Sequence, residues 1–111
     1  MTKAFDDALD PGTRIGPVVI GDVIGQGGFG IVYRAVHDRE RDVAVKEFFP
    51  KQFASRGSSG TLRASQRRWD EAWTKGLAQF AEEARALKRL RHSNIVRIHE
   101  LIEQNGSAYA V

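Results

Sequence analysis

The chain has 111 residues, of which 41% are hydrophobic and 28% charged, and its formal net charge is +3. This length allows one domain with one modest core, and the balanced composition argues against disorder along the whole chain. The sequence contains no cysteine, which excludes disulfides and thiolate metal sites. No apolar run is long enough for a signal peptide or a membrane span, so we expect a cytoplasmic location.

The first residues are mostly polar and offer little to bury, so residues 1–11 are predicted to form a flexible leader. Pro11 and Gly12 mark the entry to the folded part. From Arg14 to Ile24 the chain is rich in β-branched residues, which predicts the first strand and the approach to it.

A glycine-rich turn follows, in which Gly25, Gly27 and Gly30 have the spacing G-x-G-x-x-G. Glycine presents its N–H without a Cβ, so such a turn can approach a phosphate closely. The spacing alone also fits turn glycines and dinucleotide-binding folds. Residues 31–36 are β-branched and aromatic, which predicts a second strand where a dinucleotide fingerprint needs a helix. A P-loop is excluded because Ile31 and Val32 stand where that motif needs Lys and Ser or Thr.

A polar turn at residues 38–41 leads to a third predicted strand at residues 43–48, in which Lys46 stands in an apolar run. One interpretation is a charge that protects a sheet edge from aggregation. The glycine-rich hairpin just upstream favours a second interpretation, in which the ammonium group binds phosphate.

Residues 50–70 are rich in serine, glycine and arginine and are predicted to form a long loop, mobile from about Ala54 to Gln66. Most of the net positive charge lies in residues 50–75, close to Trp69 and Trp73. A basic segment beside aromatic rings can bind nucleic acid. We favour the simpler interpretation of a solvated loop before an amphipathic helix.

From residue 71 to residue 90 the apolar residues recur at spacings of three and four, which predicts one long helix. Glu83 lies beside this apolar stripe, so its carboxylate is expected near the sheet. A turn at residues 92–96 leads into a fourth predicted strand, Ile95 to Ile102, and the Asn105-Gly106 pair predicts a hairpin turn before a fifth strand. His92 and His99 have no metal-type partner at useful spacing, which favours structural roles.

The sequence resembles the start of a protein kinase domain, in particular that of bacterial serine/threonine kinases of the eukaryotic-like, or Hanks, type. The resemblance rests on G-x-G-x-x-G-x-V at residues 25–32, on Val-Ala-Val-Lys at residues 43–46, and on residues 80–85 and 90–96, which are similar to the αC helix and the turn after it. It covers residues 12–111 and implies an α+β fold: a kinase-like N-lobe with a five-stranded antiparallel sheet packed against one long αC helix. Residues 50–70 are then an insertion between the third strand and αC.

The resemblance also implies a site for ATP. The implied catalytic pair is Lys46, which holds the α- and β-phosphates, and Glu83, which orients Lys46. Val32 and Ala44 would form the upper wall of the adenine slot, and Phe29 would fold over the phosphates. The full set of implied nucleotide-binding residues is Ile24, Gly25, Gln26, Gly27, Gly28, Phe29, Gly30, Val32, Ala44 and Lys46.

The H-R-D and D-F-G motifs, which supply the catalytic aspartate and a Mg²⁺ ligand in kinases, do not occur in these residues. We therefore expect a fragment that stops before the hinge and the C-lobe, contains no metal ligands of its own and has no phosphoryl-transfer activity alone. The complete protein would transfer the ATP γ-phosphoryl group to Ser or Thr hydroxyls of a protein substrate. Two alternatives stay open: a free-standing lobe that docks on a partner, and, less favoured, a nucleic-acid binder. We expect no nucleic-acid partner and no membrane segment.

Overall fold

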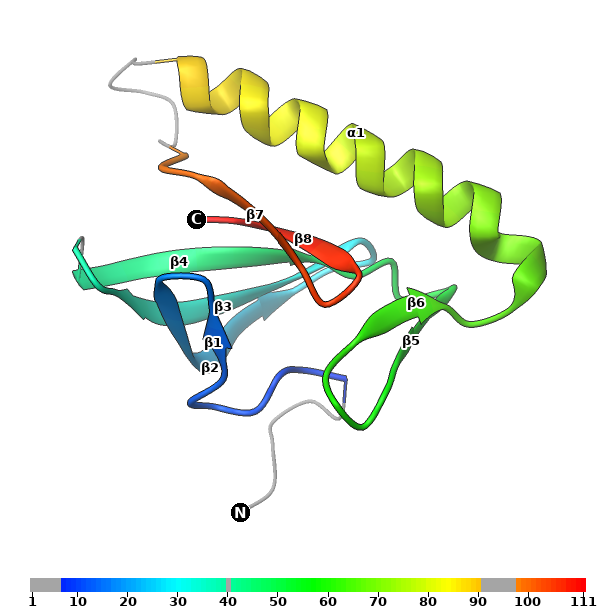
Figure 1. Ribbon diagram of the computed structural model, residues 1–111, viewed down its shortest axis with the longest axis horizontal. Coiled ribbons are helices and arrows are strands. Elements are labelled where there is room, and N and C mark those ends of the chain that lie inside the picture. The colour runs from blue at the N-terminus through cyan, green and yellow to red at the C-terminus, as the bar shows by residue number, and fades with distance from the viewer. Residues whose placement is uncertain (1–6, 40, 91–97) are drawn as a thin grey trace.

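A computed structural model describes residues 7–39, 41–90 and 98–111. They form a curved six-stranded antiparallel sheet with a long helix across one face and a separate two-stranded sheet (Figure 1). The strand order in the sheet is β1-β2-β3-β4-β8-β7. Its strands are β1 (Arg14–Ile15), β2 (Val18–Gln26), β3 (Gly30–His37), β4 (Arg41–Phe48), β7 (Leu101–Gln104) and β8 (Ser107–Ala110). The remaining elements are β5 (Ala54–Arg56), β6 (Leu62–Ala64), the short 3-10 helix η1 (Arg67–Trp69) and α1 (Asp70–Arg89).

The architecture agrees with the predicted α+β lobe. Strands β2, β3 and β4 form the expected antiparallel meander, because β-branched and aromatic residues alternate along them between the two faces of the sheet. A short additional strand, β1, pairs Arg14 with Val19 at the edge of the five expected strands. The fourth expected strand begins at Leu101 in the described residues, whereas its predicted start at Ile95 and the turn containing His92 lie outside them.

Helix α1 confirms the helix predicted from residue 71 to residue 90, since it runs from Asp70 to Arg89. It lies on the sheet through the ring of Phe48, whose centroid is 5.2 Å from that of Trp73 in an edge-on contact and 5.7 Å from that of Phe80. Gly76 faces the same ring, and a Cβ at this position would lie 3.0 Å from Cζ of Phe48. The absent side chain therefore lets the helix approach the sheet closely.

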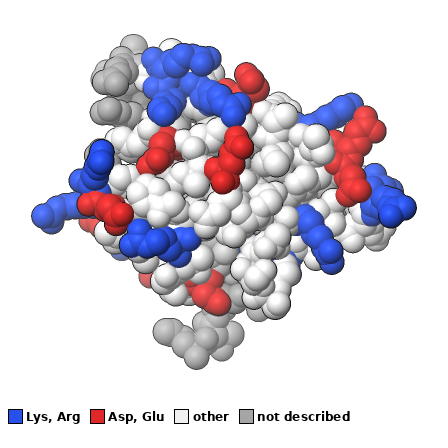
Figure 2. Space-filling model, in the orientation of Figure 1, with Lys and Arg blue, Asp and Glu red and all other residues white. Residues whose placement is uncertain are grey.

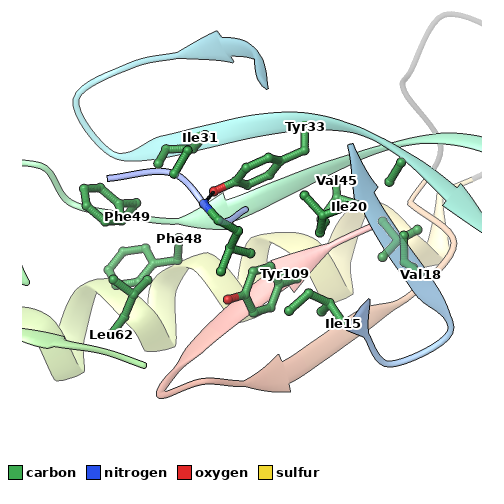
Figure 3. Packing of buried hydrophobic residues seen from close by; sticks show 14 of the residues in the cluster. Ile15, Val18, Ile20, Ile31, Tyr33, Val45, Phe48, Phe49, Leu62 and Tyr109 are labelled. Carbon is green, nitrogen blue, oxygen red and sulfur yellow. Dashed lines mark hydrogen bonds between the residues drawn. The ribbon is translucent and has the colours of Figure 1, made fainter. Parts of the chain in front are cut away.

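The hydrophobic core lies mainly on the sheet face away from Phe48 and α1. Tyr33 and Tyr109 reach into it from two strands, and Figure 3 shows aliphatic side chains packed around their rings. Ile15, Val18, Ile20, Ile31 and Val45 are each at most 1% exposed. Burial of apolar area on this scale is the main stabilising contribution for a lobe of this size.

The predicted flexible leader differs from the structure at its described end. Ala8 and Leu9 are only 2% and 4% exposed and belong to the core cluster. The N–H of Leu9 donates a hydrogen bond of 3.0 Å to the hydroxyl oxygen of Tyr33. Two apolar residues between aspartates gave too weak a sequence signal for burial, and the hydrogen-bond partner of Leu9 lies 24 positions away in the chain.

The prediction of a long loop between residues 50 and 70 is corrected by the structure, which folds this segment into the β5–β6 hairpin and η1. Leu62 is 2% exposed, and its N–H donates to the carbonyl of Asn105, 2.7 Å away. Asn105 and Gly106 form the predicted turn between β7 and β8, with φ of 57° and 73°. The hairpin is thus docked on that turn, and the serine- and glycine-rich stretch is its tip.

Candidate functional site

A pocket of about 390 Å³ opens between the sheet and α1. Its sheet side is formed by alternate residues, because side chains two positions apart on a strand share a face. Val32 of β3, Ala44 and Lys46 of β4, and Ala110 of β8 present this face. Helix α1 supplies the opposite side with Phe80, Glu83, Ala84 and Leu87, and the lining is completed by Asp42, Val43, Ile98, His99 and Val111.

Lys46 lies in the wall of this pocket, between two residues with small or branched side chains. In the strand register it is paired with Val32 on β3 and Ala110 on β8. Its aliphatic stem passes Gly30, where a Cβ would lie 3.0 Å from Cε of Lys46. The fold therefore directs the lysine between the glycine-rich turn and α1.

The glycine-rich turn joins β2 and β3 and is attached to the end of β4. The N–H of Phe49 donates to the carbonyl of Phe29 and that of Lys51 to the carbonyl of Gly28, each at 3.0 Å. Gly27 and Gly30 close the turn with a 2.9 Å backbone hydrogen bond. The Phe29 side chain at the tip is 72% exposed. The turn is thus hydrogen-bonded to the segment just after the strand that carries Lys46, while the apolar side chain at its tip is exposed to solvent.

Glu83 and Lys46 line the same space but are not joined by an ion pair within 4.0 Å in the described part of the chain. A second hollow of about 350 Å³ also has both residues in its wall, together with Phe29 of the glycine-rich turn. The Glu83 carboxylate accepts a long hydrogen bond of 3.4 Å from Gln79 on its own helix. The expected Lys46–Glu83 pair therefore stays a prediction, with both partners facing one space.

On the opposite side of β4, a carboxylate is fully buried. Glu47 follows Lys46 in the strand, so its side chain points to the other face and is 0% exposed. Three groups donate to it: the hydroxyl of Tyr33 at 2.7 Å, the hydroxyl of Tyr109 at 2.7 Å and the guanidinium of Arg56 at 2.6 Å. No buried side-chain nitrogen or oxygen in the described residues lacks a hydrogen-bond partner. We call Glu47, Tyr33, Tyr109 and Arg56 the Glu47 cluster.

Burial and the negative charge of Glu47 raise the pKa of both Tyr33 and Tyr109 above the ordinary value of 10.0. For Arg56, burial lowers the pKa, but the hydrogen bond to Glu47 and its charge act in the opposite direction, and the net result is a raised pKa. The Arg56 guanidinium and both phenol hydroxyls therefore keep their protons near neutral pH.

The sequence reasoning did not single out the Glu47 cluster, although one signal was available. Along β4 the inward positions carry Val43, Val45 and Glu47, so a carboxylate interrupts an apolar series at a position that must be buried. A buried charge needs a partner, which points to a cation elsewhere. The residues around Arg56 gave no sign that it is this cation, because their composition is that of a loop.

The basic residues do not gather into one surface on the face shown in Figure 2, where they lie in separate groups with acidic side chains between them. Arg56, one of the basic residues between positions 50 and 75, is largely buried in the Glu47 cluster. Within residues 7–39, 41–90 and 98–111 there is no group of three metal-ligating side chains close enough to hold an ion. No helix in the same ranges is long and apolar enough to span a membrane.

Comparison with known proteins gives consistent matches. The family model for the protein kinase domain matches residues 18–111. A probable serine/threonine-protein kinase, zyg-1 of Caenorhabditis briggsae, is 36% identical over 88 residues, which are 79% of this chain and 9% of that protein. The solved structure of the apo form of PpkA-294 superposes with a TM-score of 0.89 at 36% identity and covers 95% of this chain and 38% of that one. The chain thus spans well under half the length of both relatives.

Proposed function

Because the chain belongs to the protein kinase domain family, we propose that it is the ATP-binding N-lobe of a serine/threonine protein kinase. The observation that carries the proposal is the position of Lys46 on β4, in the wall of two hollows. One hollow is lined by apolar residues of the sheet and by α1, and the other by Phe29 of the glycine-rich turn, Phe48 and α1. An ammonium group in such a place attracts phosphate, and a narrow apolar slot suits a flat base.

The residues present fit a nucleotide. In this proposal the backbone of Gly25–Gly30, with Ile24, Gln26 and Phe29, covers the phosphates, and Val32 and Ala44 contact the base. Lys46 binds the α- and β-phosphates, and Glu83 approaches it when nucleotide is bound. Bound ATP would supply the phosphoryl group, and Mg²⁺ would neutralise its charge.

The lobe alone holds and orients the nucleotide, but phosphoryl transfer also needs a metal site and a positioned acceptor hydroxyl. We place these in the remainder of a longer kinase, because the chain covers 38% of the matched solved chain and lacks the H-R-D and D-F-G motifs. The complete protein would phosphorylate Ser or Thr of a protein substrate. We further propose a bacterial origin and a cytoplasmic location, where ATP is available.

The direct test is titration of the 111-residue chain with ATP, followed by NMR shift mapping. We expect shifts at the glycine-rich turn and at Lys46, with a dissociation constant near 1 mM, or roughly −4 kcal/mol. Lys46→Ala should weaken binding, whereas Lys75→Ala removes an equal charge from an exposed ion pair on α1 and should not. Shifts confined to arginines between residues 51 and 68 would contradict the proposal and favour a basic binding surface.

A further inference from the structure

Neighbouring residues of β4 face opposite sides of the sheet, with Lys46 in the nucleotide pocket and Glu47 in the core. Glu47 is paired in register with Ile31 on β3 and Tyr109 on β8, while Lys46 is paired with Val32 and Ala110. A rotation of β4 about its own axis would therefore move both side chains at once. Interactions that hold Glu47 in place therefore also limit the direction in which the Lys46 side chain leaves the strand.

The Glu47 carboxylate is held from three directions. Tyr33 belongs to the strand on one side of β4, Tyr109 to the strand on the other, and Arg56 to the separate β5–β6 hairpin. Each tyrosine hydroxyl is itself fixed, because Tyr33 accepts from the N–H of Leu9 and Tyr109 from the side-chain amide of Asn105 at 3.2 Å. Every hydroxyl thus has one donor and one acceptor, which leaves the carboxylate one favourable orientation.

Arg56 connects this carboxylate to the residues before β1 and to the tip of its own hairpin. Its Nε donates to the carbonyl of Asp7 at 2.7 Å, and one terminal nitrogen donates to the carbonyl of Gly60 at 2.9 Å. The guanidinium also lies over the ring of Phe49, 5.4 Å from its centroid. The planar group of arginine can satisfy these directions together, which a lysine ammonium cannot do in the same geometry.

We propose that Glu47 is a positioning residue for Lys46 and that Arg56 completes its support, so the β5–β6 hairpin is a functional part of the nucleotide site. The inference rests on the proposed ATP-binding function. A buried charge that leaves its partners incurs a large desolvation penalty, so the cluster resists rotation of β4. The hairpin acts at a distance, by fixing the far side of the strand whose near side binds phosphate.

A purely structural role for the cluster would affect every ligand of the pocket alike, because a loosened lobe binds base and phosphate less well. A positioning role acts through the Lys46 ammonium alone. It should therefore weaken the binding of ATP and leave the binding of adenosine, which has no phosphate, unchanged. The side-chain NMR signal of Lys46 reports the same effect without reference to affinity.

The experiment compares Glu47→Gln and Tyr109→Phe with wild type in the 111-residue chain. Glu47→Gln removes the charge that Arg56 needs, whereas Tyr109→Phe removes one hydroxyl and no charge. Glu103→Gln on β7 is the control, since it removes a carboxylate from an exposed ion pair with Arg85 of α1. Dissociation constants for ATP and adenosine, the Lys46 side-chain amine shift and the far-UV circular dichroism are measured for each.

We expect ATP binding to weaken about three- to tenfold in Glu47→Gln and less in Tyr109→Phe, with adenosine binding unchanged and the Lys46 signal shifted or broadened. Glu103→Gln should match wild type in every measurement. If Glu47→Gln fails to fold, the ATP and adenosine affinities and the Lys46 signal of Tyr109→Phe test the inference. Equal losses for ATP and adenosine, an unchanged Lys46 signal in folded variants, or loss of folding in Tyr109→Phe would each overturn the inference. Absence of ATP binding in the wild-type chain would instead refute the proposed function.

Discussion

The carbonyl oxygen of Leu62 fills the space in which a side chain at position 106 would lie. Gly106 also has a φ of 73°, a conformation that favours glycine. The β5–β6 hairpin therefore contacts the β7–β8 turn through a backbone surface that admits no Cβ.

Gly106→Ala should lower the free energy of unfolding by about 2–4 kcal/mol, because it adds displacement of the hairpin to backbone strain. Gly12→Ala is the matched control. Gly12 has a φ of 93°, and no heavy atom in the described residues lies within 4 Å of a Cβ built there. Gly12→Ala should lower the free energy of unfolding by the backbone strain of a positive φ alone, about 1–2 kcal/mol. Urea denaturation measures the free energy of unfolding of both variants. Equal losses of stability would show that the backbone at Leu62 moves away at no cost.

The two tyrosines of the chain should stay protonated in alkaline solution for as long as the lobe is folded. The sequence contains only Tyr33 and Tyr109, so phenolate absorbance reports the Glu47 cluster directly. Both have a raised pKa in the folded state, whereas in the unfolded chain they lose their protons near pH 10.0. Phenolate absorbance should appear only together with unfolding.

The stability of the lobe should decrease as the pH rises above 10. Below pH 10 both states keep the phenol protons, and the full stability is present. As the pH rises above 10, the unfolded chain binds fewer protons than the folded chain, so the free energy of unfolding falls by up to about 1.4 kcal/mol per pH unit for each tyrosine. Gradual phenolate formation near pH 10, with unchanged circular dichroism, would contradict the buried hydrogen bonds.

Hydrogen exchange should divide the segment from residue 54 to residue 66 into protected and unprotected amides. The N–H of Leu62 donates to Asn105, and that of Ser65 donates to the carbonyl of Phe53 at 2.8 Å, so both should exchange slowly. Ser58 and Ser59 at the exposed tip should exchange fast. Uniformly fast exchange would contradict the β5–β6 hairpin and support the loop predicted from the composition.

Gly30 and Gly27 should respond differently to alanine although they belong to one turn. A Cβ at Gly30 would lie 3.0 Å from Cε of Lys46 and 3.1 Å from the carbonyl oxygen of Glu47, whereas in the described residues nothing lies within 4 Å of one at Gly27. Gly30→Ala should lower the free energy of unfolding by about 1–3 kcal/mol through overpacking, and Gly27→Ala by less than about 0.5 kcal/mol. Thermal or urea unfolding of the two variants provides the measurement.

The features that the sequence predicted correctly have local causes. The helical stripe that contains Trp73 and Phe80, the Asn105-Gly106 turn and the strand that carries Lys46 each follow from periodicity or turn chemistry within a few residues. These features define the fold class and one wall of the candidate site. The role of Lys46 in binding phosphate, which the resemblance implies, stays a prediction.

The features that the sequence did not predict depend on contacts between distant residues. Arg56 stands in a polar, glycine-rich stretch, and its 2.6 Å contact is with Glu47, nine positions earlier in the chain. Leu9 is likewise held by Tyr33, which lies 24 positions further along the chain. The short strands β5 and β6 have three residues each, too few to show an alternating pattern. Single-sequence reasoning has no signal for such partners.

The Glu47 cluster restricts how this lobe evolves. A glutamate at position 47 without Arg56 is a buried charge without its counter-ion, and an arginine at position 56 without Glu47 has lost its anionic partner, so each single replacement should destabilise the lobe. Positions 47 and 56 should therefore change together, or together with a compensating substitution nearby. Homologous lobes that lack the β5–β6 hairpin should therefore carry an apolar residue where Glu47 stands, and lineages that keep the hairpin should retain both charges together.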